Sequence, residues 1–117
     1  MANADDACCP HYHEAIEFLG KRWTGAIVRV LMHRSPQRFS EIANAVPELS
    51  DRLLSERMKE LEARGVVVRT VVPDPPGGGP TRVEYALTGM GRELEPALEA
   101  LEAWAQRWLP DCDGASR

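Results

Sequence analysis

The order of the elements predicted within residues 38–88 constrains the fold of this chain more than any other feature of its sequence. Ser40 is the expected N-cap of a short helix, because its hydroxyl can accept a hydrogen bond from an amide of the first turn. Pro47 breaks that helix. Ser50 is the expected N-cap of a longer helix, which Gly65 is expected to end. Two helices joined by so short a turn predict a helix-turn-helix unit.

Two predicted strands follow the second of these helices. Val66–Val72 is a β-branched run, and Arg82–Leu87 alternates between residues expected to point inward and outward. The residues expected to point inward in the second strand are Val83, Tyr85 and Leu87. A segment rich in proline and glycine separates the strands, and Thr88 is the expected cap of a helical region after them. This order predicts a winged helix-turn-helix domain that is mostly α with a small β-hairpin, an α+β arrangement suited to duplex DNA.

Two further helices are expected before the helix-turn-helix unit. The first runs from about Tyr12 to Leu19, because apolar residues recur at helical spacing there, and Gly20 is expected to stop it. The second ends at Ser35-Pro36. Its expected apolar stripe consists of Trp23, Ile27, Val30 and Leu31.

The C-terminal region is expected to be helical and unusually apolar. Pro96 predicts either the start of a new helix or a kink in a long one. The apolar face is wider than a helix at the end of a small domain needs, so burial against a second copy is expected, with packing onto the chain's own first helix as the alternative. The residues expected in a dimer interface are Tyr12, Ile16, Leu98, Leu101, Trp104 and Trp108.

The length of 117 residues suits a single domain over residues 1–117. Its expected parts are a flexible tail (1–10), the helix-turn-helix unit (40–65), the wing (66–87) and C-terminal helices (88–110). No apolar run resembles a signal peptide or a membrane span, so a cytoplasmic protein with no membrane partner is expected.

The charged residues are distributed unevenly along the chain. The net charge is −4, yet every charged residue between Gly20 and Phe39 is basic, and acidic residues dominate only after Gly91. The net charge argues against DNA binding, but the basic residues in the first part of the chain fit a DNA-binding surface there. An ordinary solvated surface is the simpler interpretation.

The second helix of the helix-turn-helix unit has one face expected in the core and an opposite face expected to contact DNA. Leu54, Met58 and Leu61 recur at helical spacing and are expected to point inward. On the opposite face Arg52 can pair with guanine in the major groove, and Glu56 can accept from a cytosine amino group. A merely solvated helix face is the alternative. The candidate DNA-contact residues are Arg38, Ser40, Ser50, Arg52, Leu53, Ser55, Glu56, Lys59, Arg69 and Arg82.

Recognisable motifs extend from about residue 8 to residue 109. They are Cys9-Pro10; Gly20-Lys21-Arg22-Trp23-Thr24; Arg38-Phe39-Ser40-Glu41-Ile42; Leu49-Ser50 with Leu54, Arg57, Met58, Leu61, Glu62, Gly65 and Val66; and Arg82-Val83-Glu84-Tyr85-Ala86-Leu87-Thr88 with Gly91, Leu94, Leu98, Leu101 and Trp104. In this combination the chain resembles the HxlR family, a branch of the MarR-like winged-helix transcription regulators. The resemblance implies a homodimer joined through the first and last helices, with one recognition helix of each subunit in DNA.

In some members of the family the cysteine of the Cys-Pro pair senses oxidants or reactive electrophiles, and the resemblance makes Cys9 the corresponding candidate here. The helix expected after it favours a thiolate at its N-terminus, whereas an inert thiol is the alternative. Two features depart from the family pattern. The wing tip has an extra GGG, so the DNA contacts of the family's wing cannot be transferred to this chain. Cys8 precedes the usual cysteine, so the identity of a redox pair cannot be transferred either.

Other chemistry is weakly supported by the sequence. The segment CCPHYH contains ligand types that zinc prefers, but adjacent cysteines seldom both point at one ion, so no metal or cofactor is predicted. The three cysteines, Cys8, Cys9 and Cys112, lie near the termini and do not form a disulfide framework. No Ser/His/Asp set, phosphate loop or H-E-x-x-H motif is present, so no enzyme is predicted.

The expected function is sequence-specific binding of double-stranded DNA by a homodimer that regulates transcription from an inverted-repeat operator. A small molecule or an oxidant is the candidate effector, through Cys9. The alternatives are a winged helix that binds only other proteins, and a metal or thiol sensor without direct DNA binding.

Overall fold

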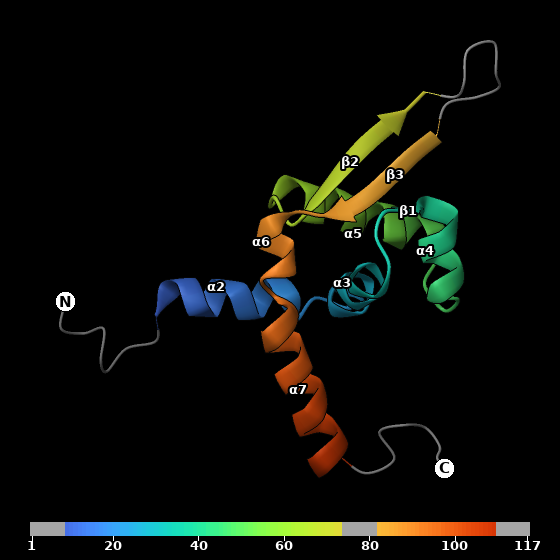
Figure 1. Ribbon diagram of the computed structural model, residues 1–117. Helices are drawn as coiled ribbons and strands as arrows, with labels where there is room; N and C mark the ends of the chain where they lie inside the picture. Colours follow the sequence, from blue (N-terminus) through green and yellow to red (C-terminus); the bar gives the residue numbers. More distant parts are fainter. Residues whose placement is uncertain (1–8, 74–81, 110–117) are drawn as a thin grey trace.

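The computed structural model describes residues 9–73 and 82–109, in which the helices and strands follow the predicted order (Figure 1). The helices are α2 (Pro10–Leu19), α3 (Thr24–His33), α4 (Phe39–Ala45), α5 (Asp51–Ala63), α6 (Gly89–Arg92) and α7 (Glu95–Trp108), and the strands are β1 (Gln37–Arg38), β2 (Val67–Val72) and β3 (Arg82–Leu87). The predicted wing tip and most of the predicted tail lie outside the described residues. Helices α4 and α5 form the helix-turn-helix unit and the β2–β3 hairpin forms the wing, so the predicted fold class is confirmed.

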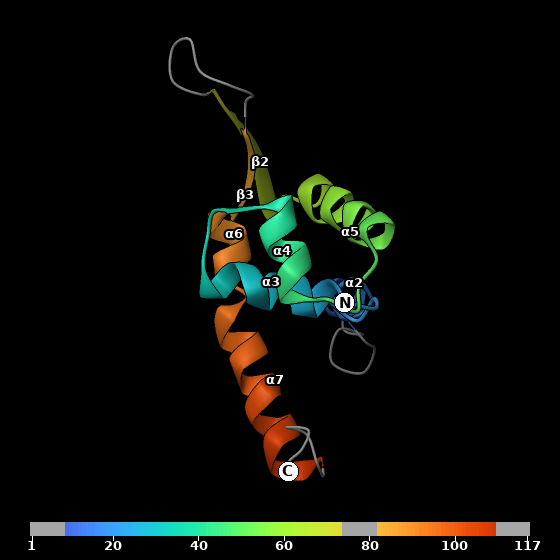
Figure 2. The same cartoon turned by 90° about the vertical axis from the view of Figure 1, so that its right-hand side faces the viewer.

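The core lies where α3, α4 and α5 meet the sheet (Figure 2). Its fully buried apolar residues are Ile27, Val28, Leu31, Ile42, Leu54 and Leu61. With Met58 at 2% exposure, they include the whole inward face predicted for α5. The stripe predicted for α3 was partly wrong, because Val28 is fully buried whereas Trp23 and Val30 are half-buried. Helix α3 contacts α2, α4, α7 and β3, so more than one of its faces is covered.

The sheet has three antiparallel strands in the order β1–β3–β2. Strand β1 was not predicted, because two residues are too few to show an alternating pattern. The inward alternation predicted for β3 was only partly right. Leu87 is buried, but Val83 and Tyr85 are half-buried like their neighbours. The outer part of the hairpin projects beyond the helices, so it has no apolar layer to pack against (Figure 1).

The ends of α5 are those predicted. The Oγ atom of Ser50 accepts a hydrogen bond from the Leu53 amide at 3.1 Å, which satisfies one of the amides left without a partner in the first turn. Gly65 follows the helix with a φ of 83°, a conformation that glycine adopts without strain.

The start of α4 differs from the prediction, since Ser40 is not its cap. The helix begins at Phe39, and the Glu41 carboxylate accepts a hydrogen bond from the Arg38 amide at 2.8 Å. A carboxylate in the first turn can reach back to the preceding amide, so this helix needs no hydroxyl cap. Ser40 is consequently an exposed residue of the first turn.

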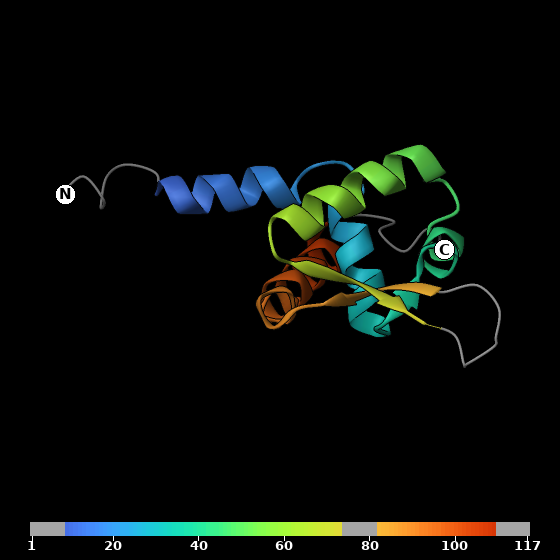
Figure 3. The ribbon, with the colours of Figure 1, turned by 90° about the horizontal axis from the view of Figure 1, so that it is seen from above.

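Helix α2 begins two residues before the predicted start at Tyr12. Pro10 is its first residue, a position where a missing amide hydrogen costs nothing, and Cys9 is the N-cap. Gly20 ends the helix as predicted, and its amide donates to the Ile16 carbonyl at 2.8 Å. None of the ten residues of α2 is buried, so the helix lies on the outside of the molecule (Figure 3).

The C-terminal region contains two helices rather than one kinked helix. The Gly91 amide donates to the Thr88 Oγ1 atom at 3.1 Å, which confirms the predicted cap. Pro96 lies in the first turn of α7 and therefore marks a new helix. Within the chain α7 packs mainly against α3, with Leu94 and Leu98 half-buried, and then extends away from the body (Figure 2).

Candidate nucleic-acid interface

Helix α5 presents the predicted DNA-contact residues on the side away from the core. The Arg52 side chain is 91% exposed, and Glu56 and Lys59 are also exposed. Ser55 is half-buried, and Leu53 packs partly against the core at the edge of this face. A helix of 13 residues with such a face has the dimensions to enter the major groove of DNA.

The charged groups on this face are weakly engaged within the chain. The Arg52 Nε atom lies 3.9 Å from the Glu56 Oε2 atom one turn later. An ion pair at this distance and exposure contributes little, so Arg52 remains available to another acceptor. In the described part of the chain Lys59 forms no ion pair.

A cleft of about 320 Å³ lies between α5 and the wing. Its lining residues are Ser55, Met58, Lys59, Glu62, Arg69 and Tyr85. Lys59 and Arg69 contribute positive charges, while Ser55 and Tyr85 contribute hydroxyl groups. These are the groups that hold DNA phosphates in protein complexes, whereas Glu62 opposes an anion. Helix α5 and the wing lie side by side in Figure 3, and residues of both line this one volume, which is suited to a backbone phosphate.

Tyr85 lines this cleft, which sequence reasoning did not foresee, and its half-buried side chain also packs partly against the core as predicted. It was assigned to the core because it alternates with Val83 and Leu87. In the sheet Tyr85 lies opposite Arg69, and residues directly opposite in an antiparallel pair share a face. Pairing the two predicted strands residue by residue is the signal that finds it.

The two arginines predicted for the wing have different surroundings. Arg69 is exposed and forms no ion pair within the described residues. The Arg82 Nε atom lies 3.2 Å from the Glu84 Oε2 atom on the same strand, and the Glu84 side chain is 24% exposed. Arg82 is therefore less available to a phosphate than Arg69.

The remaining predicted contacts lie at the starts of α4 and α5. Arg38 and Ser40 are exposed at the beginning of α4. Ser50 is exposed as well, but its Oγ atom accepts the capping hydrogen bond of α5. A hydroxyl group that accepts an amide still has its own proton to donate, so this cap and a phosphate contact are compatible.

Several large apolar side chains of α2 and α7 are exposed on the single chain. Those more than half exposed are Tyr12, Ile16, Leu101, Trp104 and Trp108, all of them predicted interface residues. Leu98, also predicted for the interface, is half-buried against the chain's own core. Large exposed apolar side chains of this kind are typical of a surface that binds a protein partner.

Cys9 is exposed at the N-cap of α2, directly before the first helical residue and so nearer to the helix than the predicted start at Tyr12 implied. Its carbonyl accepts a hydrogen bond from the His13 amide at 3.0 Å. Cys8 and Cys112, the other thiols considered, lie outside the described residues. Among residues 9–73 and 82–109, no three His, Cys, Asp or Glu side chains are grouped to hold a metal ion. None of the helices described is long and apolar enough to cross a membrane.

Comparison with known proteins associates this architecture with a family of regulators. The profile of the HxlR-like helix-turn-helix family matches residues 18–113. YvaP of Bacillus subtilis, an uncharacterised HTH-type transcriptional regulator, is 48% identical over 101 residues, which cover 86% of this chain and 89% of YvaP. YodB of the same organism, an HTH-type transcriptional regulator, is 41% identical over 105 residues, which cover 90% of this chain and 89% of YodB.

Solved structures show the same arrangement of elements. The reduced form of YodB from B. subtilis matches with a TM-score of 0.78 at 39% identity, over 89% of this chain and 97% of that one. The quinone-bound form of YodB matches with a TM-score of 0.73 at 39% identity, over 86% and 100% of the two chains. The redox regulator HypR in its reduced form matches with a TM-score of 0.75 at 28% identity, over 89% and 98%.

The matched family profile covers the helix-turn-helix unit, the wing and α7 together. The relatives are named as transcriptional regulators rather than as enzymes. The family to which the sequence motifs pointed is thereby confirmed. The chain belongs to the HxlR-like helix-turn-helix family of transcriptional regulators.

Proposed function

We propose that this regulator acts as a homodimer that binds double-stranded DNA of inverted-repeat sequence, and that a reaction at Cys9 changes this binding. The observation that carries the proposal is the surface shared by α5 and the wing. Arg52 stands exposed on α5, and the same helix lines the cleft to which Lys59 and Arg69 contribute. The proposed location is the cytoplasm, where a regulator of this kind meets its DNA, as expected for a family with bacterial relatives.

The DNA contacts divide into those that read bases and those that hold the backbone. The N-terminal half of α5 enters the major groove, where Arg52 donates two hydrogen bonds to the O6 and N7 atoms of a guanine. Lys59 and Arg69 neutralise a phosphate at the cleft, and the hydroxyl groups of Ser55 and Tyr85 donate to its oxygens. Base contacts then supply the specificity, while phosphate contacts set the register.

The exposed apolar side chains of α2 and α7 support the dimer. Tyr12, Leu101 and Trp104 are each more than half exposed on the single chain, and a second copy related by two-fold symmetry would cover them. A symmetric dimer reads two half-sites of opposite orientation, with α5 helices about 34–36 Å apart when the half-sites are one helical turn apart. The matching operator is therefore an inverted repeat.

The location of Cys9 supports the sensor role, as does the likeness to quinone-bound and diamide-treated YodB. The Cys9 thiol adds to a ring carbon of a quinone and forms a C–S bond. The thiol proton passes to one quinone oxygen and the hydrogen of the attacked carbon to the other, which gives a hydroquinone thioether. Diamide instead joins two thiols as a disulfide and is itself reduced to a hydrazine. Either product adds bulk at the start of α2, a helix of the proposed dimer interface, and so alters the spacing of the two α5 helices.

Retardation of DNA by the wild type and by Cys9→Ser tests the sensor role. A duplex selected from a random pool is titrated with each protein, before and after treatment with benzoquinone. Binding of the wild type is expected to change on treatment, whereas Cys9→Ser binds equally well before and after. An identical response of the two proteins would remove Cys9 as the sensor. If the wild type binds none of the duplexes even at low salt, a winged helix that binds only proteins would be favoured.

A further inference from the structure

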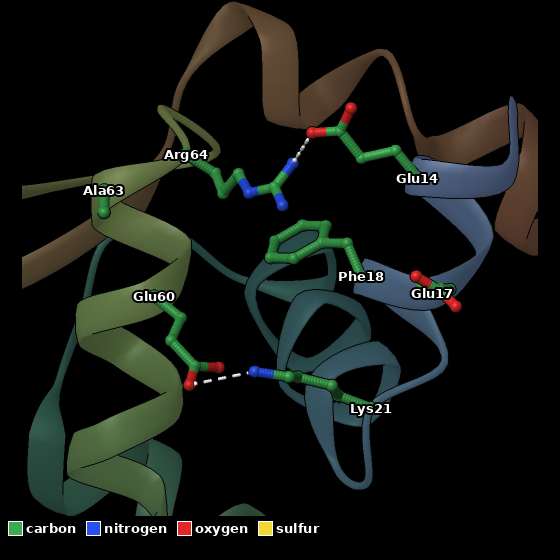
Figure 4. A pocket seen from close by; sticks show the side chains of 7 residues that line it. All are labelled: Glu14, Glu17, Phe18, Lys21, Glu60, Ala63 and Arg64. Atoms are coloured by element: carbon green, nitrogen blue, oxygen red, sulfur yellow. Dashed lines mark hydrogen bonds and ion pairs between the residues drawn. The ribbon is translucent and has the colours of Figure 1, made fainter. Parts of the chain in front are cut away.

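Helix α2 is attached to the recognition helix α5 by polar and aromatic side chains, although none of its own residues is buried. The Arg64 Nη1 atom, at the C-cap of α5, lies 2.7 Å from the Glu14 Oε2 atom. The Arg64 guanidinium also lies over the Phe18 ring, 4.8 Å from its centroid. Glu14 and Phe18 are one turn apart on α2, so both hold the same guanidinium (Figure 4).

The loop after α2 makes a second attachment to α5. The Lys21 Nζ atom lies 3.2 Å from the Glu60 Oε2 atom, and the Arg57 Nη1 atom lies 3.3 Å from Glu60 Oε1. The Arg57 Nε atom donates to the Arg22 carbonyl at 2.9 Å, and its side chain is only 15% exposed. This second attachment is better shielded from solvent, so it holds the loop in place while the first one holds the helix.

The two helices do not pack flush between these attachments. A cavity of about 420 Å³ separates them, with Glu14, Phe18 and Arg64 on one side of its rim and Lys21 and Glu60 on the other (Figure 4). The distance between α2 and the C-terminal half of α5 is therefore set by these side-chain contacts across the cavity and not by continuous apolar packing.

Helix α2 therefore has two faces with different partners. Glu14 and Phe18 point toward α5, whereas Tyr12 and Ile16 lie about half a turn round the helix and are 64% and 53% exposed. A helix with one face on the recognition helix and the other on a dimer interface transmits displacement from one to the other.

We propose that the link formed by Glu14, Phe18 and Arg64 couples α2 to DNA recognition, and this inference rests on the proposed function. A displacement of α2, caused by the partner subunit or by an adduct at Cys9, moves the C-terminal end of α5 and changes its fit to the major groove. Glu14 and Arg64 are positioning residues in this account, since they act through α5.

Glu14→Ala tests the link, with Glu17→Ala as its matched control. Both variants remove one negative charge from the α2 side of the cavity, but among the described residues Glu17 pairs only with His13 of its own helix, 3.2 Å from the Nε2 atom. Affinity for a duplex selected with the wild type is measured across a salt series. Glu14→Ala is expected to bind about two- to fivefold more weakly than Glu17→Ala, the range of an exposed ion pair. The slope against salt should be equal in both, because neither variant loses a phosphate contact.

The response to benzoquinone supplies the regulatory readout. The change in affinity that the quinone causes is expected to shrink in Glu14→Ala and to persist in Glu17→Ala. Equal affinities and equal quinone responses in the two variants would overturn the coupling. A wild type that binds no DNA, or does not respond to quinone, would instead contradict the proposed function.

Hydrogen exchange distinguishes a failure of the coupling from a failure of the proposed function, because the measurement needs neither DNA nor quinone. Amides of α2 and of the last turn of α5 are expected to exchange about two- to fivefold faster in Glu14→Ala than in Glu17→Ala. The same increase is expected in Arg64→Gln and should not add to that of Glu14→Ala in the double variant. Exchange rates that match between Glu14→Ala and Glu17→Ala would show that the link does not hold the helices together.

Discussion

Arg52 and Arg69 both extend into solvent, but their positions give them different expected roles in binding DNA. Arg52 is on the helix proposed for the major groove, and its one ion pair among the described residues is the weak one with Glu56 at 3.9 Å. Arg69 is on the wing, where the cleft also contains Lys59, two hydroxyl-bearing side chains and the opposing carboxylate of Glu62. The first arrangement suits a base edge and the second a phosphate.

Arg52→Ala is expected to relax sequence preference at one position of each half-site. Loss of a bidentate pair to guanine removes about 1–3 kcal/mol of discrimination there, while preferences at other positions persist. Competition between duplexes that differ at single base pairs measures this change. An equal loss of affinity for every duplex would assign Arg52 to the backbone instead.

Arg69→Ala is expected to weaken all duplexes alike. Loss of one phosphate contact lowers the slope of log K against log salt by about one unit. Arg82→Ala serves as the matched control, because the Glu84 pair at 3.2 Å already engages that arginine. A larger effect of Arg82→Ala than of Arg69→Ala in the same salt titration would reverse the assignment.

At the scale of the elements, α6 depends on a close approach to the residues between α5 and the sheet. A Cβ atom added at Gly91 would collide with the Val66 carbonyl oxygen and press on the Leu87 side chain, whereas one added at Gly89 meets nothing. Gly91→Ala is expected to lower the free energy of unfolding by about 1–3 kcal/mol, as overpacking does.

Urea denaturation at one fixed protein concentration measures both glycine variants. Gly89→Ala is the control and should unfold at or slightly above the wild-type midpoint, since alanine restricts the unfolded chain. Equal midpoints for Gly89→Ala and Gly91→Ala would mean that α6 moves freely enough to admit a side chain.

Elements with local signals were predictable from the sequence, and those that depend on distant partners were not. Ser50, Gly65 and Thr88 mark helix ends through their own side chains or backbone freedom, and each does so in the structure. The start of α4 was misplaced because Glu41, inside the helix, supplies the cap. Strand β1 exists only because β3 pairs with it.

The same limit applies to the candidate site. The outward residues of α5 follow from helical spacing, which the buried opposite face confirms. The place of Tyr85 in the cleft follows from strand pairing, which the single-strand pattern does not contain. The Lys21–Glu60 and Glu14–Arg64 pairs join residues 39 and 50 positions apart, so only the folded chain brings them together.

At the scale of the whole molecule, the exposed apolar residues of α7 predict the oligomeric state. Leu101→Glu combined with Trp104→Glu is expected to convert a dimer into monomers or aggregates, because four charges would enter one symmetric interface. Val68→Glu combined with Val71→Glu is the matched control, since these wing residues are also about half exposed but lie far from α7 along the chain. Sedimentation at micromolar concentration distinguishes the two. A wild type that sediments as a monomer would contradict the dimer.

The central claim is that two copies of this chain present two α5 helices to one DNA duplex. Selection of bound duplexes from a random pool, followed by sequencing, tests it most directly. The account predicts enrichment of an inverted repeat whose half-sites are centred about 10–10.5 base pairs apart, with guanine preference that Arg52→Ala relaxes. Enrichment of a single unrepeated site, or no enrichment above the starting pool, would contradict it.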